Sequence, residues 1–239
     1  MLNFIFNLYE KKLIENLSNS SVKNILEKMN DNNYYFPYNI WKKYFDTNSI
    51  EGGKEISWFA YREIEKINDI NNFEFLKSIC EDLESNKELI NKSFFALGHL
   101  AKNTKNKLVF EYLMEKIKSE GEENKETILI AITNCEKPKD YNLEPIYDIL
   151  KNARVGLKTS AAMCLKKSEN PQTEEKLIQA LTIEKNQHFQ EMTASTLSDI
   201  GTEISLPILK EKLKTGKGRD YKYFLNNAIE EIEARKNNR

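Results

Sequence analysis

The sequence is short of the residues that break helices and of those that build metal sites. Eight glycines and five prolines in 239 residues are fewer than a many-stranded β fold needs for its turns, so a helical fold is favoured. The three cysteines have no CxxC spacing, and the two histidines lie far apart. Because zinc sites need clustered ligands, we expect no metal centre, and we expect the cysteines to be free buried thiols in a reducing compartment.

An excess of either charge and a long apolar run are also missing. The 36 Lys and Arg residues balance 37 Asp and Glu, which gives a net charge of −1. Proteins that hold a phosphate backbone usually carry a basic excess, so nucleic acid is disfavoured as a partner. The sequence shows neither a secretory signal pattern nor a run of membrane-spanning length, which predicts a cytoplasmic protein without a membrane partner.

The sequence does contain a repeat of apolar positions. One column recurs about every 33 residues, at Ile64, Leu97, Ile132, Leu165, Leu197 and Ile229. Positions four before and three after it are mostly apolar too, and these offsets share one face of an α-helix. A preceding column with a similar period comprises Leu83, Ile117, Leu150, Leu181 and Leu213. Two columns predict two helices per repeat, which bury their apolar faces by stacking on the neighbouring repeats.

Glycine and proline fall between these columns. Gly121, Gly201 and Gly216 stand where helices are expected to begin or end. Pro145 and Pro207 stand where a first helical turn is expected, a position that tolerates the missing N–H. This punctuation supports the same helix boundaries as the two columns.

Two stretches of the sequence resemble a known family. Residues 194–209 (ASTLSDIGTEISLPIL) and 95–100 (FALGHL) are similar to the HEAT repeat of the phycobilisome-lyase type. The resemblance covers residues 56–235 and implies an all-α fold, namely a right-handed α-solenoid of about six helical pairs. Leu157-Lys158 keeps the character of the family's Val-Arg pair, whereas Phe189-Gln190 departs from it, so the charged ladder between repeats is incomplete.

The N-terminal part fits the repeat less well. Residues 2–17 and 21–30 are expected to form a helical pair, and the aromatic stretch 34–45 follows. Such a stretch is either a cap on the open end of a solenoid or a ligand surface. We therefore predict an N-terminal helical, aromatic-rich capping region over residues 1–55 and one continuous HEAT-like repeat domain over residues 56–239.

The second helices of such solenoids line a concave binding side. Positions −5, −2 and +2 from the first column are expected to point outward there, and they include Phe59 and Lys92 at position −5. The predicted protein-binding residues on this ridge are Arg62, Lys66, Phe95, His99, Ile130, Asn134, Met163, Lys167 and Asp199. Among them, Phe95, Ile130 and Met163 form an apolar row at position −2, flanked by the polar His99, Asn134 and Lys167. Such a row is typical of a protein interface, although it would also suit packing between repeats. The ridge is basic near Arg62, Lys66 and Lys92, and acidic near Asp199.

The sequence shows no nucleophile elbow and no phosphate-binding loop, so we expect neither a catalytic residue nor a cofactor. The function expected is a non-enzymatic scaffold that grips another protein, either as an immunity (neutralising) protein or as an assembly adaptor, and that is a monomer or a weak homodimer. Two alternatives stay open: a HEAT-like nucleic-acid enzyme of the alkylpurine DNA glycosylase kind, and a bilin lyase subunit. The glycosylases use Trp and Asp on a basic surface, whereas this chain has only Trp41, Trp58 and a local basic tract over residues 210–222.

Overall fold

The computed structural model describes residues 2–33, 55–82, 84–133 and 135–237. Within these ranges the chain forms thirteen α-helices and no β-strand, so the predicted all-α class is confirmed. The aromatic stretch 34–45, Leu83 and Asn134 lie outside the described residues. The chain divides into two compact units between Thr104 and Lys105, and each unit has its own core.

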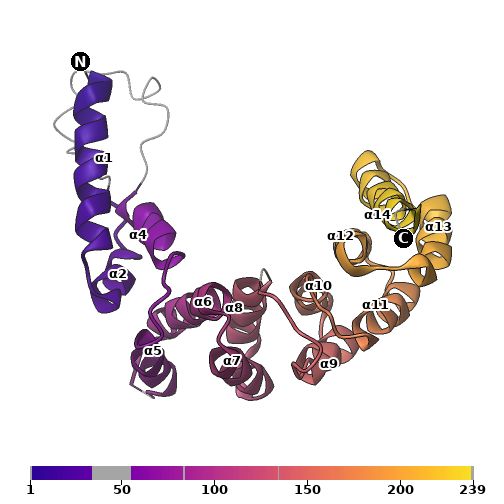
Figure 1. Cartoon of the computed structure of the whole chain (residues 1–239), viewed down its shortest axis with the longest axis horizontal. Coiled ribbons are helices and arrows are strands. Elements are labelled where there is room, and N and C mark those ends of the chain that lie inside the picture. Colours follow the sequence, from indigo (N-terminus) through magenta and orange to yellow (C-terminus); the bar gives the residue numbers. More distant parts are fainter. Residues whose placement is uncertain (1, 34–54, 83, 134, 238–239) are drawn as a thin grey trace. The chain divides into compact units, whose positions relative to one another are not determined.

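Unit 1 (residues 1–104) contains the N-terminal helices. They are α1 (Leu2–Ser18), α2 (Val22–Lys28), α4 (Ile56–Ile64), α5 (Asn72–Glu81) and α6 (Lys87–Thr104). Helices α1 and α2 occupy the positions of the predicted helical pair. Both contact α4, while α5 packs against α6 (Figure 1).

The core of unit 1 combines the predicted second-helix column with residues outside both columns, such as Leu26 and Leu76. Ile64 of α4, Leu76 of α5 and Leu97 of α6 are each at most 1% exposed. A polar contact joins the two second helices: the Asn103 side chain of α6 donates from Nδ2 to the carbonyl oxygens of Glu65 and Ile67, both at 2.8 Å. Asn103 therefore supplies partners for carbonyls at the end of α4, which the helix itself leaves unpaired.

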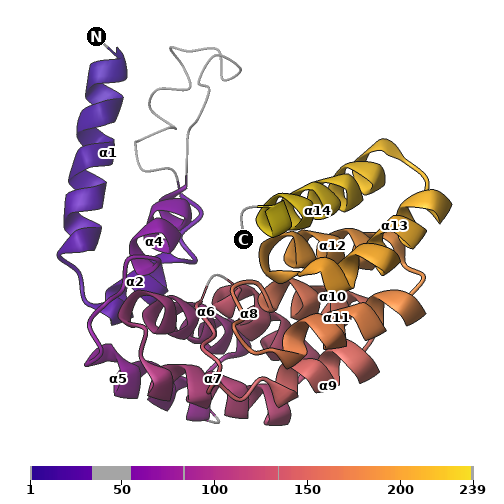
Figure 2. The same cartoon turned by 45° about the vertical axis from the view of Figure 1, so that its right-hand side comes forward.

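Unit 2 (residues 105–239) is a two-layered helical array. Its helices are α7 (Lys107–Ser119), α8 (Glu122–Ile132), α9 (Glu144–Asn152), α10 (Val155–Cys164), α11 (Gln172–Ile183), α12 (Gln187–Ile200), α13 (Leu206–Thr215) and α14 (Arg219–Asn237), with a short 3-10 turn, η2 (Glu203–Ser205). Helices α7, α9, α11 and α13 contact one another in sequence, and so do α8, α10, α12 and α14 (Figures 1 and 2). The predicted first and second helices therefore form separate layers.

The predicted columns lie between these layers. Ile132, Leu165 and Leu197 from the second helices are completely buried, as is Leu181 from a first helix. The punctuation was also predicted correctly, since Gly201 caps the end of α12 and Pro145 lies in the first turn of α9. The repeat read from the sequence thus matches most of this core, whereas Leu213, the last member of the first-helix column, is half-buried.

Lys137 joins the C-terminal ends of α8 and α10 from within the core. Its side chain is buried, and its Nζ donates to the carbonyl oxygens of Cys135 at 2.7 Å, Lys166 at 2.9 Å and Thr133 at 3.4 Å. Its backbone also donates to Lys167 O at 3.1 Å. A cation is favoured there because helix C-termini carry partial negative charge. Burial lowers the pKa of the Lys137 ammonium, and the three carbonyls supply the hydrogen bonds that a buried donor needs.

Later second helices are joined in the same manner. Thr196 of α12 donates to the carbonyl oxygen of Ala162 in α10 at 2.8 Å. Arg235 of α14 donates to the carbonyl oxygens of Ser198 at 2.6 Å and Gly201 at 2.9 Å, at the end of α12. Each contact satisfies a carbonyl of the preceding second helix. None of the described helices combines the length and the apolar character needed to cross a bilayer.

Candidate protein-binding surfaces

Unit 1 gathers aromatic side chains on its two second helices. The α4–α6 aromatic cluster consists of Trp58, Tyr61 and Arg62 on α4 with Phe95 and His99 on α6. The rings of Tyr61 and Phe95 meet edge to face with centroids 5.4 Å apart, and those of Phe95 and His99 lie 4.6 Å apart. The Arg62 guanidinium carbon is 5.7 Å from the centroid of the Trp58 ring. Spacings of three and four residues place these side chains on one face of each helix.

The cluster combines one exposed ring with half-buried rings, and its histidine resists protonation. Trp58 is 40% exposed, while Phe95 and His99 are half-buried. Burial, together with the charges of Lys102 and Arg62, lowers the pKa of His99 to about 4, against the opposing effect of a hydrogen bond with the Glu65 backbone. His99 is therefore neutral at neutral pH. Its buried Nδ1 has no hydrogen-bond partner among the described residues.

The predicted basic residues of this ridge are ion-paired within α4 and its end. Arg62 lies 2.6 Å from the Glu65 carboxylate, and Lys66 lies 2.7 Å from Glu63. Both cations are exposed, so these pairs are screened by water and contribute little to stability. Arg62 and Lys66 therefore remain accessible to a partner protein.

In unit 2 the predicted residues fall into two kinds. Ile130 of α8 is 57% exposed, and Met163 of α10 is half-buried. Lys167 and Asp199 are instead joined to each other, because the Asp199 carboxylate accepts the Lys167 backbone N–H at 2.8 Å. Lys167 has a positive φ of 58°, which a lysine adopts reluctantly, so this hydrogen bond has a structural role. Asn134, the remaining predicted residue of the ridge, belongs to the part of the chain that is not described.

The expectation that position −5 points outward is wrong in unit 1. Phe59 is 3% exposed and Lys92 is 4% exposed. Position −5 lies on the flank of the helix rather than opposite the apolar column, so it is covered by packing. The Lys92 Nζ lies 3.0 Å from the Glu88 carboxylate, an ion pair whose angles fall outside hydrogen-bond geometry. The basic end of the ridge thus consists of Arg62 and Lys66 without Lys92.

Sequence reasoning did not single out Trp58 and Tyr61 as members of a surface. The available signal was their spacing from Arg62, since residues three and four apart on a helix lie side by side. Phe59 stands at a predicted outward position instead, but its ring packs against Trp58 with centroids 5.0 Å apart.

The described residues contain no group of three or more His, Cys, Asp and Glu side chains arranged for a metal ion. The three cysteines are buried, as predicted. Burial raises the pKa of the Cys164 thiol to about 12, so this thiol stays protonated and is a poor nucleophile.

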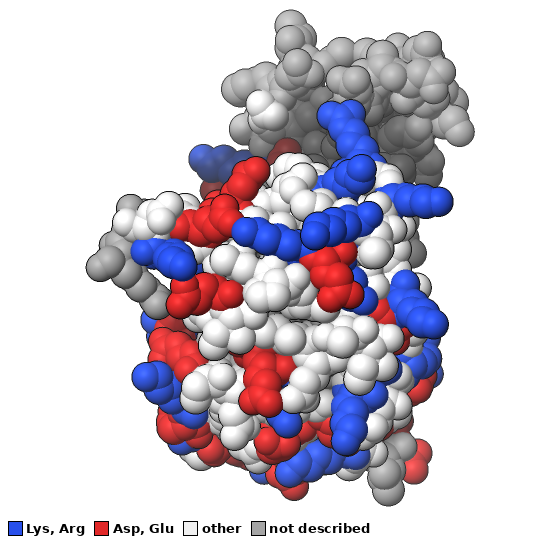
Figure 3. Space-filling model, turned by 90° about the vertical axis from the view of Figure 1, so that its right-hand side faces the viewer, with Lys and Arg blue, Asp and Glu red and all other residues white. Residues whose placement is uncertain are grey.

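Charge is mixed on the face of the molecule seen in Figure 3. Lys and Arg side chains alternate there with Asp and Glu, and no broad field of one sign forms. Within the basic tract, Lys210 is paired with Glu233 at 2.7 Å, and Lys212 donates to the carbonyl oxygen of Thr182 at 3.4 Å. Nucleic-acid surfaces concentrate positive charge, and this face does not.

No protein-family model matches the chain, and no curated protein is significantly similar to it.

Proposed function

We propose that this protein is a non-enzymatic, HEAT-like α-solenoid that binds another protein on the concave side formed by its second helices. The two-layered array of unit 2 supports this proposal, because solenoids stack helical pairs in the same manner and bind partners along one layer. The all-α fold supports the architecture, and the function rests on the surface residues.

The observation that carries the proposal is the exposure of Ile130. An apolar residue that packed between repeats would be buried like its neighbours Leu129 and Ala131, whereas Ile130 is 57% exposed on a second helix. The α4–α6 aromatic cluster adds Trp58 and Arg62, which are residue types that dominate the energetics of protein interfaces. Each unit therefore offers apolar contact area on a second helix.

The mixed charge on the face seen in Figure 3 favours a protein partner over a nucleic acid. Two forms of this function are an immunity protein that neutralises a toxin and an adaptor that assembles a complex. Both need a rigid surface with exposed apolar anchors and neither needs a catalytic group.

The test is binding to a partner recovered with the tagged chain and then purified. Nuclease treatment during recovery removes any partner bridged by nucleic acid. Ile130→Asp and Arg62→Glu are expected to weaken binding of the purified partner because they place a charge into, or reverse a charge beside, the apolar contacts. Isothermal titration calorimetry measures both changes.

Ile204→Asp is the matched control, because Ile204 is 71% exposed but lies in η2 rather than on a second helix. It should bind as the wild type does. Unchanged affinity in both Ile130→Asp and Arg62→Glu would contradict the proposed surface. Recovery that disappears with nuclease would favour the nucleic-acid alternative.

A further inference from the structure

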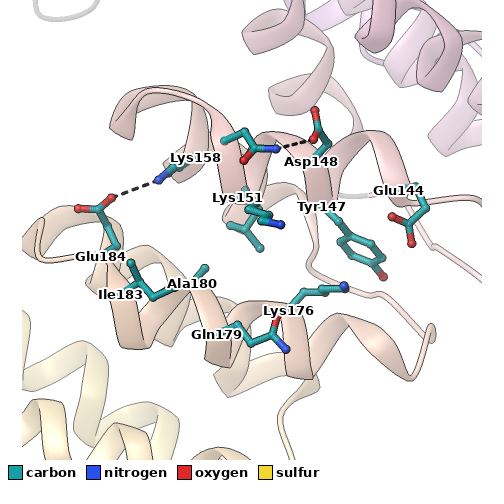
Figure 4. Close-up of a pocket in the computed structure, with 12 residues that line it drawn as sticks. Glu144, Tyr147, Asp148, Lys151, Lys158, Lys176, Gln179, Ala180, Ile183 and Glu184 are labelled. Carbon is teal, nitrogen blue, oxygen red and sulfur yellow. Dashed lines mark hydrogen bonds and ion pairs between the residues drawn. The ribbon is translucent and has the colours of Figure 1, made fainter.

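Unit 2 contains a groove on its other layer, away from Ile130. It has a volume of about 340 Å³ and lies between α9 and α11, beside the first turn of α10 (Figure 4). Tyr147 and Leu150 of α9 and Ala180 and Ile183 of α11 give it an apolar lining. The volume falls at the small end of the range of about 300–1,000 Å³ typical of small-molecule sites.

Two lysines enter this groove without a partner of their own. Lys151 extends from α9 and Lys176 from α11, so that positive charge comes from both walls (Figure 4). Among the described residues, neither ammonium group forms an ion pair or a hydrogen bond. Lys176 is half-buried, which reduces its contact with water.

The acidic side chains of the groove are mostly engaged elsewhere. Glu184 accepts the backbone N–H groups of Lys185 at 2.9 Å and Asn186 at 3.1 Å, and it pairs with Lys158 at 3.5 Å. These hydrogen bonds lower the pKa of Glu184, and the one from the Asn186 backbone has the largest effect. The Glu184 carboxylate therefore stays ionised and already has its own partners.

Of the remaining acids, Asp148 accepts the Asn152 side-chain amide at 2.7 Å. Glu144 is exposed and lies in the first turn of α9, where the helix dipole stabilises its negative charge. Local carboxylates therefore leave the Lys151 and Lys176 ammonium groups available.

We propose that the α9–α11 groove binds a small organic anion, a carboxylate or phosphate ester that carries an apolar group. Its anionic head lies between the exposed Lys151 and the half-buried Lys176, and it forms charge-assisted hydrogen bonds with both. Its apolar part packs against Tyr147, Ala180 and Ile183. The proposal is independent of protein binding on the second helices, because α9 and α11 belong to the other layer.

The probe is phenyl phosphate, titrated into isotope-labelled full-length protein and followed by NMR shifts of the backbone amides. Benzoate tests the carboxylate form of the same chemistry, and benzyl alcohol provides a neutral aromatic of similar size. We expect both anions to shift amides around Lys151, Lys176 and Ala180. The Lys151→Gln/Lys176→Gln double variant should bind at least about tenfold more weakly, as expected for the loss of charged hydrogen-bond donors.

Two further variants separate the groove from general charge. Lys214→Gln removes an exposed lysine of α13 outside the groove and should leave the affinity unchanged. Ala180→Leu fills the groove with a larger side chain and should abolish binding while the rest of the spectrum is preserved. Equal affinity for benzyl alcohol, unchanged affinity in the double lysine variant, or shifts located outside α9 to α11 would each overturn the proposal.

Discussion

At the scale of single residues, the ring of Tyr221 leaves no space for a side chain at Gly216. A Cβ atom on Gly216 would lie 1.7 Å from Cε1 of that ring. The ring has little room to move, because Tyr221 is 1% exposed and its hydroxyl donates to Gln190 Oε1 at 2.6 Å. We expect Gly216→Ala to lower the free energy of unfolding by about 1–3 kcal/mol, the usual cost of overpacking, as measured by urea denaturation.

Gly121 is the matched control for this substitution. It also flanks a helix, but a Cβ atom there would meet nothing within 4 Å. Gly121→Ala should change the free energy of unfolding by less than about 0.5 kcal/mol. Equal effects of the two substitutions would contradict close packing of Tyr221 on Gly216.

His99 gives the fold a dependence on pH. Burial, with the charges of Lys102 and Arg62, lowers its pKa from 6.5 in the unfolded chain to about 4 in the fold. The unfolded state therefore binds a proton first as the pH falls. The stabilisation is fully present above about pH 6.5 and is lost progressively as the pH falls towards 4.

Removing the imidazole should flatten this dependence. In His99→Gln the urea midpoint should decline less than in the wild type between neutral pH and about pH 4. His188→Gln, which changes a histidine with an exposed side chain, is the control for the loss of one imidazole. Parallel curves for the wild type and His99→Gln would show that His99 titrates alike in both states.

At the scale of helices, Lys137 is a buried polar link between the ends of α8 and α10. Lys137→Met keeps most of the side-chain volume but removes the donor for three carbonyl oxygens. Because unpaired buried carbonyls are costly, we expect the free energy of unfolding to fall by about 1–3 kcal/mol or more. Lys139→Met, at a nearby exposed position, should have little effect. A more stable Lys137→Met variant would mean that burial of the charge outweighs its hydrogen bonds.

The helices themselves could be predicted because their signal is local. Each apolar column repeats within one helix, and burial of the second-helix column follows directly from its period. The links between helices could not be predicted in this way. Lys137 lies in a loop beside Pro138, where a lysine is normally solvated. It is buried because the end of α10, which is distant in sequence, packs against it.

Glu174 shows that a departure from a column can itself be a signal. It lies seven residues before Leu181 of the first-helix column, and the positions seven residues before Leu150 and Leu213 carry the apolar Leu143 and Leu206. In the structure its carboxylate accepts the Thr202 backbone N–H at 2.7 Å and the Ser205 hydroxyl at 2.6 Å, which joins α11 to the following repeat. The contact spans repeats, so the period alone gives no partner for it.

At the scale of the whole molecule, the candidate surfaces were predictable to different degrees. The grouping of Arg62, Phe95 and His99 followed from helical spacing and from the assignment of α4 and α6 as second helices. The α9–α11 groove was not predicted, because Lys151 and Lys176 look like ordinary solvated lysines in the sequence. What distinguishes them from other surface lysines is the groove between α9 and α11, and that groove exists only once the two helices have packed together.

The division into two compact units leads to a prediction about folding. Residues 105–239 bury their own core between two helical layers, so we expect this fragment to be helical by circular dichroism and to unfold cooperatively in urea. Gly216→Ala and Lys137→Met should destabilise the fragment as much as they destabilise the whole chain, because all their contacts lie within the unit. If the fragment fails to unfold cooperatively, or if either substitution affects only the full chain, the core of unit 2 must depend on residues before Lys105.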